Sequence, residues 1–221
     1  MRLVDGISSW GPAAILGIGG GIYGFLADRL AARWPEHEDA ARRPVDWRTA
    51  LVVLLAAGAF FALPGRFGSL RDIVLGGAFF AALIVLLATD LDQRLLPDEI
   101  TLPLIPAALV VLLAGWDPVL AGKELGMASG LAAAVLAPLF LGVTGALFRG
   151  ALGIGDLKLA VSLGLVCGIS QLIAGFIVAS LAAGVVLLAL LATRRLGLRS
   201  AIPFGPILIL AAFLAVLRPI T

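Results

Sequence analysis

The sequence predicts an all-α polytopic membrane protein with about eight transmembrane helices, and three observations support this fold class. Hydrophobic residues make up 61% of the 221 positions, and the mean hydropathy is +1.11. Charged residues make up 14%, whereas soluble domains carry roughly a quarter. Leu, Ala, Val, Ile and Gly form runs long enough to cross a bilayer. We therefore expect residues 1–221 to form a single membrane-embedded domain.

Eight apolar segments carry this prediction, and they follow one another with short polar connections. They are 10–30, 48–64, 72–89, 101–116, 125–148, 157–168, 170–192 and 203–217. The first contains "GIGGGIYG", in which Gly17, Gly21 and Gly24 are typical of helix-packing positions. A span needs about 20 residues, so the second and sixth segments are short. The sixth is a separate span, a half-helix, or part of an interrupted hairpin with the seventh.

The basic residues predict the orientation of the spans. Eleven of the sixteen Lys and Arg residues lie in or beside alternate connections, and five lie on the other side. The positive-inside rule therefore places 31–47, 90–100, 149–156 and 193–202 in the cytoplasm and both termini outside.

Two aspartates stand at the cytoplasmic edge of this predicted bundle. Asp90 directly follows the third apolar segment, and Asp156 directly precedes the sixth. The fourth and fifth segments cross the membrane and return between the two aspartates, so helix packing could bring the two carboxylates together. Such a pair shares one proton, and its ionised member can accept a proton from water while its protonated member polarises a carbonyl. This is the chemistry of an aspartic protease.

Glycines beside the second aspartate fit the same interpretation. Gly153 and Gly155 flank Ile154 just before Asp156. Glycine lets the backbone bend and lets another backbone approach closely, which an extended substrate strand requires.

Other interpretations of these acids remain open at this point. Asp156 is also suited to capping a helix N-terminus, with Gly155 as a turn residue. Asp90 is also compatible with a solvated loop acid. A small proton-coupled transporter would use the same two acids as a relay, and a catalytically inert membrane scaffold is a further alternative. We predict no metal site, because "DLD" at 90–92 offers two acids alone.

Other function classes lack the residues they need. Cys167 is the one cysteine and His37 the one histidine, which excludes an intrachain disulfide and a cysteine-based zinc site. The net charge of +2 gives no indication of nucleic-acid binding.

Three motifs in order resemble the prepilin peptidases, the type IV leader peptidases of the GxGD class of intramembrane aspartic proteases. They are "DLDQRLLPDEITLPL" (90–104), "GIGDLKLAVSLGLVCG" (153–168) and "IPFGPILILAA" (202–212). The resemblance implies a peptidase core over residues 73–212. It also touches "GIYGFLADRLAARWP", which is similar to the glycine-rich first helix of that family.

The resemblance implies roles for individual residues. The catalytic aspartates fall on Asp90 and Asp156, and Lys158 matches a lysine often found two residues after the second. The residues implied to shape the site are Gly153, Gly155, Asp92, Pro97, Asp98, Pro203 and Gly205.

The sequence also departs from the family pattern. Many members carry two cysteine pairs that hold zinc after the first span, whereas 31–47 is short and has no cysteine. Gly150 stands where members often have an acid.

The resemblance leads to specific expectations about activity and partners. The protein would cleave the leader peptide from prepilin or pseudopilin substrates whose apolar helix lies in the bilayer. It would do so in the bacterial inner membrane, with the active site facing the cytoplasm. Proteolysis would need no cofactor, and S-adenosylmethionine would be needed only if the family's N-methyltransferase activity is retained. The sequence does not indicate an oligomeric state.

Overall fold

The computed structural model describes residues 2–34, 44–147, 153–192 and 204–218, and within these ranges the secondary structure is helical, without strands. The helices are α1 (Arg2–Ala31), α2 (Trp47–Arg66), α3 (Leu70–Gln93), α4 (Asp98–Leu113), α5 (Gly126–Leu147), α6 (Ile154–Ala192) and α7 (Gly205–Leu217). The predicted all-α class is confirmed. Side chains of residues 2–9 and 189–192 lie outside the description.

The starts of several helices follow from local sequence chemistry. Asp46 caps α2 by accepting from the backbone N–H groups of Arg48 and Thr49, and the Thr49 hydroxyl accepts in return from the Asp46 N–H. This reciprocal arrangement satisfies N–H groups that a helix start leaves free. Ser69 caps α3 through a single hydrogen bond, which its hydroxyl accepts from the Asp72 N–H.

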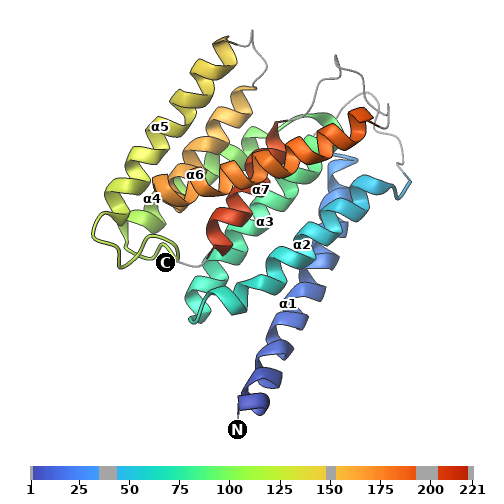
Figure 1. Ribbon diagram of the computed structural model, residues 1–221, viewed down its shortest axis with the longest axis vertical. Helices are drawn as coiled ribbons and strands as arrows, with labels where there is room; N and C mark the ends of the chain where they lie inside the picture. The colour runs from blue at the N-terminus through green and yellow to red at the C-terminus, as the bar shows by residue number, and fades with distance from the viewer. Residues whose placement is uncertain (1, 35–43, 148–152, 193–203, 219–221) are drawn as a thin grey trace.

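Helix α3 lies at the centre of the bundle (Figure 1). It contacts α1, α2, α4 and α7, and its residues from Leu83 to Asp90 are all buried. Phe80 of α3 packs edge-to-face against Phe213 of α7, with ring centroids 4.8 Å apart. The consequence is that the C-terminal end of α3 is held inside the protein.

Helices α1 and α2 form a tightly packed pair on one side of the bundle (Figure 1). A Cβ at Gly24 would lie 2.8 Å from Ala56 Cβ, and one at Gly17 would lie 3.1 Å from Phe61 Cβ. The expectation that these glycines serve helix packing is confirmed. Gly20 makes the same kind of approach to Phe60, so a glycine face on α1 accepts α2.

Helix α6 is broken near its middle. Gly168 has φ 66° and ψ 178°, a conformation essentially confined to glycine. Gly168 therefore divides α6 into two halves that correspond to the expected segments 157–168 and 170–192, and the first is a half-helix, which was one of the alternatives for the sixth segment. The backbone N–H of Ile169 donates to the Ser129 hydroxyl of α5 at 3.0 Å, which satisfies a group released by the break.

The predicted number of eight spans is not confirmed. Among the described residues, five helices are long and apolar enough to cross a membrane, namely α1 from Trp10, α2, α3, α5 and α6 to Leu188. Helix α7 is a shorter apolar helix, and α4 has 16 residues.

Candidate active site

Asp90 lies in the last turn of α3 and is buried, with 5% of its surface exposed. The helix continues past it to Gln93, so Asp90 is not the loop residue of the alternative interpretation. Its Oδ2 atom has no hydrogen-bond partner among the described residues. Gly205 at the start of α7 lies against it, since a Cβ there would be 2.6 Å from Asp90 Oδ2. The absent side chain of Gly205 thus leaves room for the Asp90 carboxylate.

Asp156 lies in the first turn of α6 and is also buried, with 8% of its surface exposed. Its Oδ2 atom accepts a hydrogen bond from the Gly153 N–H at 3.1 Å. Because α6 begins at Ile154, Asp156 follows the helix start and does not occupy the N-cap position considered above. The carboxylate reaches back to the start of its own helix, as the acidic residue of a capping box does.

The two carboxylates come from the last turn of α3 and the first turn of α6, two helices that each contact α4 and α7. Asp90 feels the negative charge of Asp156 and, in the opposite sense, the positive charge of Arg94. Two charges interact more strongly in a buried region, because protein atoms replace water there and lower the local dielectric constant. The arrangement can therefore hold one shared proton between two buried acids.

The second GxGD glycine allows α6 to approach the connection between α3 and α4. A Cβ at Gly155 would lie 2.9 Å from Leu96 Cβ. Pro97 follows as the N-cap residue of α4 and is buried. Arg94 ends α3 in the left-handed region with φ 54°, which glycine adopts more readily than arginine. This sharp turn carries the chain from Asp90 to the start of α4.

Two ion pairs tie the surrounding helices together. Lys158 donates to both Asp98 carboxylate oxygens at 2.7 Å, which joins the first turns of α6 and α4. Arg48 of α2 pairs with Asp92 of α3 at 3.2 Å. Asp98 and Asp92 are among the residues expected to shape the site. Lys158 comes two residues after Asp156, and Asp92 comes two residues after Asp90.

The sequence analysis missed two residues that the structure places at the site. Leu96 packs against Gly155, and Arg94 forms the turn after Asp90. Neither role could be predicted from the sequence, because a leucine is common in any apolar sequence and an arginine is not expected at positive φ. Pro203, Gly150 and His37 lie outside the described residues.

A cluster of three or more His, Cys, Asp and Glu side chains able to hold a metal is not found within the described ranges. The acids nearest the site are used in other ways, since Asp92 and Asp98 form the ion pairs above.

Comparison with known proteins covers the first two of the three motifs. The type IV leader peptidase family matches residues 77–188, which include both candidate aspartates. The chain belongs to this family. The match extends from the middle of α3 into the second half of α6, so it covers the excursion through α4 and α5 that separates Asp90 from Asp156.

Curated relatives carry matching names. A prepilin leader peptidase/N-methyltransferase of Bacillus subtilis is 33% identical over 165 residues, covering 74% of this chain and 63% of the relative. One of Aeromonas hydrophila is 30% identical over 167 residues, covering 76% and 56%. The chain thus spans less than two thirds of the length of these relatives. No solved structure matches the chain significantly.

Proposed function

We propose that this protein is an intramembrane aspartic endopeptidase that uses Asp90 and Asp156 as its catalytic pair. The observation that carries the proposal is the pair itself: two buried carboxylates, one in the last turn of α3 and one in the first turn of α6. Membership of the type IV leader peptidase family supports it, because the matched region includes both residues.

The reaction requires no covalent intermediate with the enzyme. The ionised aspartate takes a proton from water, whose oxygen attacks the carbonyl carbon of the scissile peptide bond. The protonated aspartate donates its proton to the carbonyl oxygen. Collapse of the tetrahedral intermediate breaks the C–N bond, and the amine leaves with a proton returned by the first aspartate.

The substrate class follows from the names of the relatives and from the site's position at a helix boundary. We propose prepilin-like or pseudopilin proteins, cut between a short basic leader and the apolar helix that follows it. The enzyme would lie in the bacterial inner membrane with the acid pair at the cytoplasmic side, where the excess of Lys and Arg predicts it. The bilayer and the substrate helix are then its partners.

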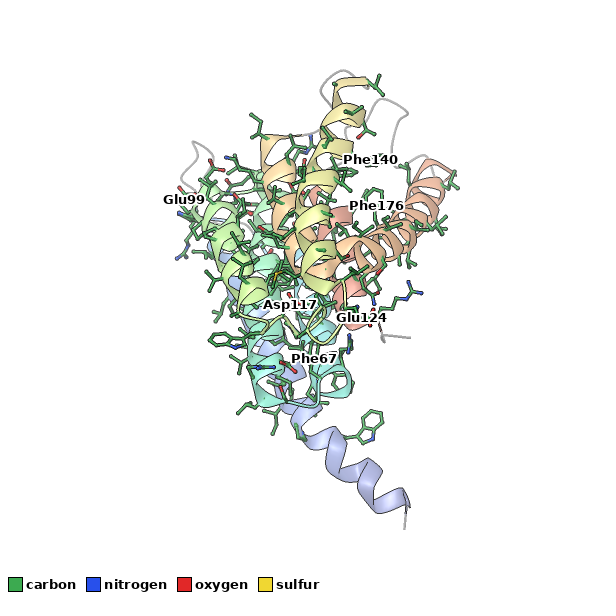
Figure 2. All side chains as sticks on the ribbon, turned by 90° about the vertical axis from the view of Figure 1, so that its left-hand side faces the viewer. Phe67, Glu99, Asp117, Glu124, Phe140 and Phe176 are labelled. Atoms are coloured by element: carbon green, nitrogen blue, oxygen red, sulfur yellow. The ribbon has the colours of Figure 1, made fainter. Side chains whose placement is uncertain are left out.

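The names of the relatives also include N-methyltransferase, which implies S-adenosylmethionine. Two cavities among the described residues do not fit that cofactor. A cavity between α5 and α6 is lined by apolar side chains, and a second one, between α3 and α4, has Glu99 and Asp117 at opposite ends of α4 (Figure 2). Neither offers the grouped polar contacts that a charged nucleoside needs. We assign no methyl-transfer step to these residues.

The test is cleavage of a prepilin-type substrate co-expressed with the protein, read from the mass of the product. Asp90→Asn and Asp156→Asn should each abolish cleavage, because one neutral amide cannot replace a carboxyl that exchanges a proton. The product mass of the unaltered enzyme also reveals whether a methyl group is added to the new N-terminus.

Asp117→Asn is the matched control, because Asp117 is a buried aspartate at the far end of α4. It should leave cleavage intact. Cleavage that survives in purified Asp90→Asn or Asp156→Asn protein would overturn the proposed pair.

A further inference from the structure

A cavity of about 670 Å³ lies between α5 and the two halves of α6. Helix α5 and the first half of α6 pack closely, whereas the second half of α6 diverges from α5 after the break at Gly168 (Figure 1). Phe140 of α5 and Phe176 of the second half of α6 flank this opening (Figure 2). We call this cavity, with Leu136, Phe140, Leu163, Ile173 and Phe176 among its lining residues, the α5–α6 groove.

The lining of the groove comes close along the chain to the candidate catalytic pair. It includes Ala160 and Leu163, which follow Asp156 on α6 by about one and two helical turns. It also includes Leu208 of α7, which comes one turn after Gly205, the glycine that lies against Asp90. The groove therefore begins about one turn along α6 from Asp156 and about one turn along α7 from the residue that contacts Asp90.

The chemistry of the lining favours an apolar helix over a charged leader. The lining residues are Ala, Leu, Ile, Val and Phe. Basic residues predominate on the predicted cytoplasmic side, so electrostatics would not attract a basic leader. A peptide bond cut directly before an apolar helix must lie at the aspartates, so the first turns of that helix must lie beside them.

The size of the groove limits how much of a helix it receives. A helix is about 10 Å across and rises about 5.4 Å per turn, so 670 Å³ is of the order of one to two turns. The groove is therefore large enough for the first turns of a helix, and the rest of that helix would lie beyond it.

We propose that the α5–α6 groove binds the first turns of the substrate's apolar helix and thereby presents the preceding peptide bond to Asp90 and Asp156. This inference rests on the proposed function and adds to it the surface that selects the substrate. Phe140 and Ile173 contact the bound helix from opposite sides.

Disulfide crosslinking to an uncut substrate tests the groove directly. The enzyme carries Cys167→Ala, which removes the native thiol, and Asp156→Asn, which keeps the substrate intact. Single cysteines are introduced as Phe140→Cys and Ile173→Cys in the groove. The matched controls are Val135→Cys on α5 and Val178→Cys on α6, which do not line it. Exposed fractions match within each pair, at 61% and 65% on α5 and 54% and 52% on α6.

The substrate is a prepilin-type protein with one cysteine in the second turn of its apolar helix, oxidised briefly in membranes. The groove cysteines should form about tenfold more crosslinked product than the controls, equivalent to about 1.4 kcal/mol of preferential occupancy. Equal crosslinking at all four positions would overturn the proposal, because it would mean that lipid fills the groove and the substrate diffuses past it.

A parallel measurement separates this outcome from failure of the proposed function. The same four cysteine variants are prepared with Asp156 restored and assayed for cleavage. If the protein cleaves the substrate but the groove cysteines do not crosslink preferentially, the docking surface is refuted and the proposed peptidase activity is supported. If the groove cysteines crosslink preferentially but neither these variants nor the unaltered protein cleaves the substrate, the docking surface is supported and the proposed peptidase activity is refuted.

Discussion

At the scale of single residues, the candidate site depends on glycines that leave room for neighbouring side chains. Gly205 leaves space for the Asp90 carboxylate, and Gly155 leaves space for Leu96. Both aspartates could be proposed from the sequence because each stands at the boundary of an apolar run. Their surroundings were not found, since the packing of Leu96 and the turn at Arg94 depend on contacts between separate parts of the chain.

Gly205→Ala should lower the cleavage rate strongly. The added methyl would lie 2.6 Å from Asp90 Oδ2, so the carboxylate has to move, and a displacement of about 1 Å in an active site can cost about 10²-fold in rate. Initial cleavage rates at equal enzyme level in membranes measure the effect. Gly58→Ala is the control, because a Cβ at Gly58 meets no atom within 4 Å. A Gly205→Ala enzyme as active as this control would contradict the close packing.

Asp117 makes stability depend on pH. It lies in the connection between α4 and α5, where its Oδ1 accepts from the N–H groups of Val119 and Leu120 and its Oδ2 has no partner within the described part of the chain. Burial raises the pKa of Asp117 to about 6 from an ordinary value near 3.8. The two backbone hydrogen bonds and Lys123 act in the opposite direction, and Asp72 adds to the effect of burial.

Because this pKa is raised in the folded protein, the folded state holds a proton that the unfolded state has lost between about pH 4 and 6. Stability should therefore fall as pH rises through this window, by at most on the order of 3 kcal/mol. Asp117→Asn keeps an oxygen for both N–H groups and should remove the part of this dependence that Asp117 contributes. Thermal unfolding of both proteins in detergent at pH 4.5 and 6.5 measures it, and parallel profiles would refute the assignment.

At the scale of elements, most helices could be predicted from hydrophobic runs, because each run is bounded by charged residues, Gly or Pro. Hydrophobic runs could not predict how the segments 157–168 and 170–192 are joined. No charged residue or proline marks the break in the sequence, and one glycine with positive φ separates the two halves. That φ value depends on contact with α5 and the Leu120 region, which a one-dimensional pattern does not contain.

Gly168→Ala should destabilise the protein and reduce cleavage. The substitution forces a side chain into a conformation that costs about 1–3 kcal/mol. Its Cβ would also lie 2.8 Å from both Leu120 Cδ2 and Ser129 Oγ. A lower thermal midpoint in detergent is the expected measurement, together with a lower cleavage rate. Gly184→Ala should change neither, because Gly184 lies in the same helix with open space around its Cα.

At the scale of the whole molecule, the charge asymmetry makes a prediction about sidedness. Val45 lies in the predicted cytoplasmic connection and Leu70 lies near the predicted outer end of α3, and both side chains are exposed. In a Cys167→Ala background, Val45→Cys should react with a membrane-impermeant maleimide only after the cytoplasmic side is opened. Leu70→Cys should react in intact spheroplasts. The reverse pattern would invert the topology and move the aspartates to the outer side.

The divergence of α6 from α5 has a kinetic consequence. If the α5–α6 groove receives the substrate, it receives it from the side, through the apolar phase in which both proteins are embedded. Encounter is then a two-dimensional diffusion process, and its frequency depends on the number of substrate helices per unit area of bilayer. Adding lipid to reconstituted vesicles should slow processing, whereas diluting the same vesicles in buffer should leave it unchanged.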